Sequence, residues 1–142
     1  MAQGGTGLSA TPQIALVGCG YWGKNLCRNF HALGALSSVV DATENGQTTA
    51  RTLAPDAGIT ESLDDVLMHD QIHGVALATP AETHADLAIQ AMQAGKDVFV
   101  EKPMALTLED AEKMKKVAEE TDAFLWLDIS WNSTLRFLNF EK

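Results

Sequence analysis

The chain is poor in basic residues. Its 142 residues include 10 lysines and arginines against 19 aspartates and glutamates, which gives a formal net charge of −9. No basic patch is visible, so nucleic acids and anionic membranes are not expected partners. No apolar run reaches the roughly 18 residues that cross a bilayer. The start MAQGGTGLSATP lacks the charged and apolar regions of a signal peptide. A cytoplasmic protein is expected, with residues 1–12 as a flexible tail.

Cysteine and histidine are also scarce. Cys19 and Cys27 are the only cysteines, and without CxxC spacing they are expected to be reduced thiols. Cys19 lies in a glycine-rich stretch where a helix N-terminus can lower a thiol pKa, although an inert, space-filling role is favoured. The four histidines lack metal-ligand spacing, and no Ser-His-Asp order or Walker lysine is present. No metal site is expected.

What the chain does contain is a short apolar run followed at once by a glycine-rich turn. Residues 13–17 lead into GCGYWG at 18–23, the G-x-G-x-x-G order of a dinucleotide-binding turn. The first glycine lets the chain turn off a strand, the second lets the backbone approach a pyrophosphate, and the third lets a helix pack closely. The helix N-terminus then offers N–H groups to the phosphates. The cofactor-binding candidates here are Gly18, Gly20, Tyr21, Trp22 and Gly23.

Asp41 is the next candidate, because it ends the apolar stretch 36–40. A carboxylate at the tip of the second strand can accept hydrogen bonds from both ribose hydroxyls of an adenosine. It would also repel a 2′-phosphate, so NAD is favoured over NADP. The alternative is a solvated turn aspartate, because the following residues are typical of a turn.

Thr79 and Pro80 close the apolar run 75–77, and a helix is expected to open near His84. Ligands of an open parallel sheet sit beyond the carboxyl ends of its strands, so this turn is placed to meet a nicotinamide ring. The alternative is an ordinary strand-to-helix turn with Thr79 or Thr83 as its cap. His84 is the histidine nearest the expected cleft. It is included among the cofactor-binding candidates, although a structural role is favoured over a catalytic one.

Glu101-Lys102-Pro103 follows a buried-looking strand at 97–100. Pro103 removes a ladder donor and fixes the turn, so Lys102 can project into the cleft beside the nicotinamide. Desolvation there would lower the pKa of Lys102 and suit it to proton transfer, which makes it the catalytic candidate. Glu101, Lys102 and Pro103 are all counted with the cofactor-binding residues. The alternative is a surface lysine paired with Glu101.

The coarse layout alternates strands and helices. Strands are expected near 13–17, 36–41, 74–78, 97–100 and, if the tail folds, 124–129, with a short extended piece near 57–60. Helices are expected near 22–33, 46–54, 62–69, 82–94 and 107–120. This alternation predicts an α/β fold with a doubly wound parallel sheet, a Rossmann domain over residues 13–121.

Together these residues carry a family resemblance. The order GCGYWGKN, Asp41 and then ATPAETHADLAIQAMQAGKDVFVEKPMAL resembles the Gfo/Idh/MocA oxidoreductases over about residues 12–120. The run GYWGKNLCRNFHALGAL resembles a branch acting on nucleotide-linked sugars, such as UDP-N-acetyl-glucosaminuronate dehydrogenases. The resemblance implies hydride transfer between a sugar carbon and nicotinamide, with Lys102 beside the substrate hydroxyl. It also implies homo-oligomers, and a second domain that holds the sugar and a histidine acid/base.

The chain departs from this family after residue 121. One Rossmann unit uses nearly all of its length, so the C-terminal substrate domain is expected to be missing. One choice of codons for residues 126–140, shifted by one base, reads MVGHLLEFHPAFLKL, which is similar to the strand and Gly-His motif of the family. We therefore interpret residues 122–142 as an aberrant tail produced by a frameshift. The alternative is a genuine short homologue with an unusual tail.

Two functions follow from the sequence. The first is the cofactor-binding half of an NAD(P)-dependent oxidoreductase acting on a sugar or nucleotide sugar, with little turnover expected from this chain alone. The second is a truncated, non-catalytic NAD-binding or interaction module.

Overall fold

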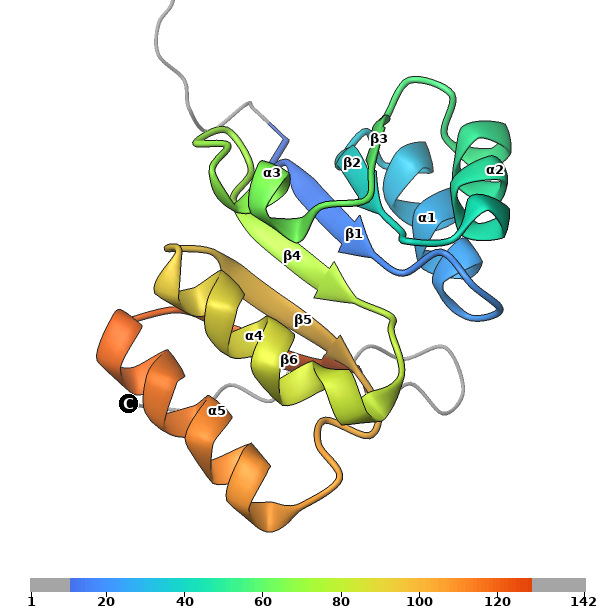
Figure 1. Ribbon diagram of the computed structural model, residues 1–142. Coiled ribbons are helices and arrows are strands. Elements are labelled where there is room, and N and C mark those ends of the chain that lie inside the picture. Colours follow the sequence, from blue (N-terminus) through green and yellow to red (C-terminus); the bar gives the residue numbers. More distant parts are fainter. Residues whose placement is uncertain (1–10, 129–142) are drawn as a thin grey trace, which may run out of the picture.

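The computed structural model describes residues 11–128, which form one twisted sheet with helices on both faces (Figure 1). The six strands are all parallel, in the order β3-β2-β1-β4-β5-β6. The strands are β1 (Ile14–Val17), β2 (Leu36–Val40), β3 (Gly58–Thr60), β4 (Gly74–Leu77), β5 (Asp97–Glu101) and β6 (Leu125–Asp128). The helices are α1 (Gly23–Ala32), α2 (Glu44–Leu53), α3 (Leu63–Leu67), α4 (His84–Gln93) and α5 (Leu108–Thr121). The predicted doubly wound Rossmann fold is confirmed.

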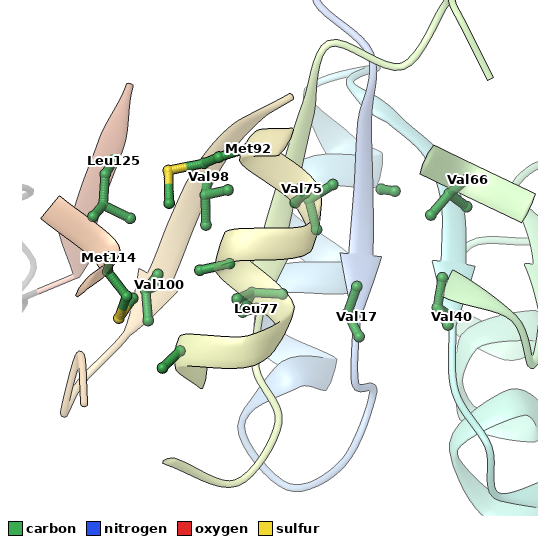
Figure 2. Close-up of a cluster of buried hydrophobic side chains, with 14 of the residues drawn as sticks. Val17, Val40, Val66, Val75, Leu77, Met92, Val98, Val100, Met114 and Leu125 are labelled. Carbon is green, nitrogen blue, oxygen red and sulfur yellow. The ribbon is translucent and has the colours of Figure 1, made fainter. Parts of the chain in front are cut away.

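Side chains of the central strands alternate between two hydrophobic cores. Val75 and Leu77 of β4 lie in one core, whereas Ala76 between them lies in the other. Successive strand residues point to opposite faces, and parallel strands are covered on both. The larger core lies between the sheet and helices α3, α4 and α5, and Figure 2 shows its valines, leucines and methionines gathered there. The smaller core packs α1 and α2 on the opposite face.

Three helices differ from their predicted bounds. The helix expected near 82–94 is split, since a 3-10 turn (Ala81–Thr83) precedes α4. The helix expected near 46–54 begins at Glu44, because the hydroxyl of Thr43 caps it by accepting a hydrogen bond from the N–H of Gly46. The helix expected near 62–69 is shorter and spans only Leu63–Leu67, as α3. Predicted boundaries shift because caps and tertiary contacts decide where a helix starts.

Strand β6 lies within the segment that was interpreted as aberrant. Leu125 to Asp128 pair in parallel with Val98 to Glu101 of β5, so residues 122–128 complete the edge of an ordinary Rossmann sheet. Residues 129–142, on which the frameshift hypothesis mainly depends, lie outside the described residues, as do residues 1–10 of the expected tail. Both hypotheses stay predictions. Within residues 11–128, no helix is long and apolar enough to cross a bilayer.

Candidate cofactor-binding site

The glycine-rich turn joins β1 to α1, and its three glycines meet different surroundings. Gly18 has a φ of +93°, and a Cβ on it would lie 2.8 Å from the carbonyl oxygen of Ala78. A Cβ on Gly23 would overlap the carbonyl oxygen of Gly18, whereas a Cβ on Gly20 would meet no described atom within 4 Å. Packing within the chain therefore requires the first and third glycines. The open space at Gly20 suits the close approach of a phosphate to the backbone.

Tyr21 and Trp22 form the exposed tip of this turn. Their exposed fractions are 86% and 47%, and the Nζ of Lys24 lies 5.2 Å from the centroid of the Tyr21 ring, a cation–π distance. The backbone N–H groups of Gly20, Tyr21 and Trp22 find no acceptor among residues 11–128. Together with the N-terminus of α1, these groups and the Lys24 ammonium can receive an anion.

Asp41 directly follows β2 and is 9% exposed. Its Oδ2 accepts a hydrogen bond from the N–H of Cys19 at 2.8 Å. Its Oδ1 accepts from the N–H of Thr43 at 2.8 Å and from the Thr43 hydroxyl at 2.7 Å. Burial alone would raise the pKa of the Asp41 carboxyl, but these hydrogen bonds outweigh it and hold the pKa below its ordinary value. Asp41 is therefore a buried anion at neutral pH, and not a solvated turn residue.

The Asp41 carboxylate has less free acceptor capacity than the sequence suggested. A carboxylate oxygen accepts about two hydrogen bonds, so Oδ1 is filled by Thr43 and Oδ2 keeps one position for a ribose hydroxyl. The backbone of Gly46 packs against another side of the Asp41 carboxylate, so closely that a Cβ on Gly46 would overlap the carboxylate. Thr43 and Gly46 were not among the predicted site residues. The signal available to find them was the Asp-x-Thr-x-x-Gly order at the start of α2.

The helix N-terminus does not lower the pKa of Cys19, the less favoured of the two possibilities. A hydrogen bond with the Cys27 thiol, burial and the nearby Asp41 carboxylate together raise the pKa of Cys19 well above its ordinary value. Both thiols are buried, so Cys19 remains a protonated thiol that fills space behind the turn. This agrees with the inert role that the sequence favoured.

Thr79 and Pro80 form the turn between β4 and α4, and His84 is the residue that fixes it. The His84 ring is 1% exposed, with Nε2 lying 2.8 Å from the carbonyl oxygen of Thr79. Neither threonine supplies the helix cap that was considered as an alternative, because the Thr83 hydroxyl instead pairs with the Thr79 hydroxyl at 2.7 Å and the Pro80 carbonyl at 2.7 Å. The turn is thus held from within by side chains.

Glu101, Lys102 and Pro103 follow at the end of β5. Glu101 is buried, whereas Lys102 and Pro103 are exposed, and the Lys102–Pro103 peptide bond is cis. The Nδ1 of His84 lies 2.8 Å from the carbonyl oxygen of Pro103. Lys102 therefore stands at the expected edge of the sheet, but residues 11–128 do not provide the burial on which its expected desolvation depends.

These turns are linked in the same order as the strands that carry them. Asp41 after β2 binds Cys19 after β1, and Gly18 packs against Ala78 after β4. His84 then joins Thr79 after β4 to Pro103 after β5. The predicted site residues therefore form one continuous line along the carboxyl edge of the sheet, where ligands of doubly wound folds bind.

The family relationship is decided by a match to a family model. Residues 13–129 match the model described as "Oxidoreductase family, NAD-binding Rossmann fold". The chain belongs to the Gfo/Idh/MocA oxidoreductase family. The resemblance drawn from the glycine turn, Asp41 and the Glu-Lys-Pro stretch is confirmed, and the match extends past residue 121.

Relatives and solved structures of this family share the domain. The 2,7-anhydro-N-acetylneuraminate hydratase of Mediterraneibacter gnavus is 36% identical over 111 residues, covering 78% of this chain and 29% of that protein. The WlbA dehydrogenase of Bordetella pertussis, solved with NADH and UDP-GlcNAcA, has 30% identity and a TM-score of 0.76, covering 83% of this chain and 37% of that one. KijD10, a 3-ketoreductase from Actinomadura kijaniata solved with NADP and TDP-benzene, shares the fold at 20% identity and a TM-score of 0.76. The match covers 84% of this chain and 38% of KijD10.

The chain of this Gfo/Idh/MocA member spans about a third of the length of these proteins. The domain that it contains is the NAD(P)-binding one. NADH and NADP each appear with solved structures that share its fold, so fold similarity does not choose between the two cofactors. The choice depends on the side chains at the end of β2.

Proposed function

We propose that this chain is the cofactor-binding half of an NAD-dependent enzyme that transfers hydride between nicotinamide and a carbon of a sugar or nucleotide sugar. The observation that carries this proposal is the continuous line of contacts from Asp41 to Pro103. These contacts bring the glycine-rich turn, Asp41 and Lys102 to one edge of the sheet, and this supports roles for them as phosphate turn, ribose acceptor and proton partner. Family membership supports the redox class, and the likeness to WlbA supports a nucleotide-linked sugar.

The preference for NAD over NADP rests on the charge of Asp41. Its three hydrogen bonds keep it ionised, and it keeps an acceptor position on Oδ2 beside the turn that would hold the pyrophosphate. A 2′-phosphate placed there would bring two negative groups together in a chain of net charge −9. Like charges brought together in this way weaken binding strongly.

Lys102 is the residue that we propose moves the proton. Oxidation of a hydroxyl to a carbonyl removes a hydride and a proton, and the cofactor, when bound, supplies the hydride acceptor. The amine of Lys102, beyond the end of β5, can take the hydroxyl proton and return it in the reverse direction. Its exposure on this chain means that bound substrate and cofactor would have to supply the desolvation.

Calorimetric titration of the 142-residue chain with NADH and with NADPH tests the cofactor assignment. We expect NADH to bind about tenfold more tightly or better, because of charge repulsion at Asp41. Gly20→Val should abolish NADH binding by filling the open space over the turn. The matched control is Gly58→Val in β3, where a Cβ meets Ser38 Oγ at 3.5 Å and the Ser37 carbonyl oxygen at 3.8 Å, both ordinary contact distances. Retained NADH affinity in Gly20→Val would overturn the pyrophosphate assignment.

A second candidate function keeps the same cofactor but produces no net oxidation. It is favoured by the 36% identity to a protein named as a hydratase, since hydration adds water without changing the redox state of the substrate. Incubation of substrate with NAD⁺ separates the two functions: a dehydrogenase accumulates NADH, whereas the second candidate converts substrate without it. NADH binding with no conversion of any sugar, in a form of the protein that also carries a substrate domain, would instead support the non-catalytic module.

A further inference from the structure

We propose that His84 is a positioning residue, whose doubly protonated ring ties the Thr79–Pro80 turn to the Lys102–Pro103 loop. It would thereby set where Lys102 stands relative to the nicotinamide. This inference rests on the proposed function for the location of the nicotinamide. The link between the two loops is independent of any ligand.

The His84 ring spans the gap between the ends of two neighbouring strands. Its Nε2 lies 2.8 Å from the carbonyl oxygen of Thr79, and its Nδ1 lies 2.8 Å from the carbonyl oxygen of Pro103. The residue is 1% exposed and begins α4, whose apolar stripe anchors it in the larger core. Both contacts reach backbone atoms, so a movement of the ring would move the main chain of both loops together.

Both ring nitrogens face acceptors, and this determines the chemistry of the ring. A neutral imidazole carries one N–H and can donate to only one of the two carbonyls, which leaves a lone pair against the other. An imidazolium donates to both at once, and hydrogen bonds from a charged donor are stronger than neutral ones. The structure assigns His84 the charged form because only that form satisfies both contacts.

Charged residues lie on the segments that His84 joins and on the helix packed against them. On its own side, Glu82 and Asp86 flank it in sequence, and both are exposed. On the β5 side stand Glu101, which is buried, and Lys102, which is exposed. On α5, which packs against α4, Lys113 is close enough to Asp86 to interact with it electrostatically.

The consequence for Lys102 follows from the peptide bond that it shares with Pro103. The carbonyl that accepts from His84 belongs to the residue directly after Lys102. When the ring is removed, the Thr79 turn and the Pro103 loop lose their common partner. The nicotinamide end of the site should loosen, while the phosphate turn, held by Cys19 and Asp41, should not.

Binding of two ligands to the full chain separates positioning from general destabilisation. NADH reaches the nicotinamide end, whereas ADP-ribose carries only the adenosine, diphosphate and second ribose. We expect His84→Ala to bind NADH about tenfold more weakly, in line with the loss of a charge-assisted buried hydrogen bond, and to bind ADP-ribose within about twofold of wild type. His84→Asn, whose amide can still donate to one carbonyl, should recover part of the loss. His73→Ala, an exposed histidine before β4, is the matched control. Equal losses for both ligands in His84→Ala would overturn the positioning role.

The protonation of the ring is tested separately on the wild-type chain. A long-range ¹H–¹⁵N spectrum at neutral pH should show both nitrogens of His84 protonated, with the signal assigned by its absence in His84→Asn. One protonated and one unprotonated nitrogen would overturn the imidazolium assignment, whether or not the alanine variant folds. Failure of the wild-type chain to bind either NADH or ADP-ribose would contradict the proposed function, while the spectrum would still decide the link between the loops.

Discussion

The carboxylate of Asp41 accepts a hydrogen bond from the backbone N–H of Cys19, 22 residues earlier in the chain, at 2.8 Å. This bond joins the phosphate turn after β1 to the end of β2. The residue expected to recognise the adenosine ribose therefore also holds the turn that would contact the pyrophosphate. Changes at Asp41 should affect stability and cofactor choice together.

Asp41→Asn preserves the shape of the side chain but removes its charge and half of its acceptor capacity. We expect a loss of about 1–3 kcal/mol in the free energy of unfolding, because a buried amide would have to face N–H donors. We also expect a smaller preference for NADH over NADPH. Urea unfolding and calorimetric titration measure the two effects. Asp56→Asn, at an exposed aspartate, should change stability by less than about 0.5 kcal/mol.

The stabilisation by Asp41 should depend on pH in a defined direction. Its pKa in the folded chain is lowered, so its contribution is complete above the unfolded-state pKa of about 3.9. The contribution is then lost as the pH falls through the folded-state value. The difference in unfolding free energy between wild type and Asp41→Asn should be constant from neutral pH to about 5 and should shrink below about 4. A difference that grows on acidification would contradict the assignment.

Gly46→Ala tests how tightly α2 packs against this carboxylate. In an ordinary helix position the change stabilises by roughly 0.5–1 kcal/mol. Here the new Cβ would overlap the Asp41 carboxylate, so we expect a loss of about 1–3 kcal/mol and weaker NADH binding. In an Asp41→Ala background the same change should become stabilising. Asn45→Ala, exposed one residue earlier, is the control.

Thr43 and Thr107 provide a matched pair of helix caps. Each hydroxyl accepts a hydrogen bond from a backbone N–H three residues on, at 3.0 Å and 3.1 Å. Only Thr43 also donates to Asp41. Thr107→Ala should cost about 1 kcal/mol of unfolding free energy, and Thr43→Ala about twice that, because a hydrogen bond to a carboxylate is lost as well. Equal losses by urea unfolding would mean that the Thr43–Asp41 bond adds no stability.

Most of the fold was predictable because strand and helix patterns alternate so clearly. The strand residues Val75, Ala76 and Leu77 are apolar in succession, which indicates a strand buried on both faces. The exact starts of α2 and α4 were not predictable, because they depend on Thr43 and on a 3-10 turn. Both features are held by local polar hydrogen bonds, which leave no mark on the hydrophobic periodicity from which the helix bounds were predicted.

The site was predicted as separate residues, and the structure adds the contacts between them. The glycine spacing predicts a phosphate turn, but no local pattern shows that Asp41 accepts a hydrogen bond from Cys19, 22 residues away. From the sequence, His84 is a candidate only as the histidine nearest the expected cleft. Its contact with Pro103 spans 19 positions and depends on the β4–β5 pairing, which sequence periodicity does not encode.

Lys102 and Lys24 should respond differently to truncation, because they stand at opposite ends of the expected cofactor. Lys24 lies at the phosphate turn over Tyr21, so Lys24→Ala should weaken NADH binding by about fivefold, or about 1 kcal/mol. Lys102 lies beyond β5, where a proton partner needs no contact with the phosphates. Lys102→Ala should leave NADH affinity within about twofold of wild type, while removing conversion of sugar in any form of the protein that has it. Calorimetric titration of both variants measures the contrast. Weakening by Lys102→Ala that matched or exceeded the Lys24 effect would make Lys102 a cofactor-holding residue and would remove the basis for its role in proton transfer.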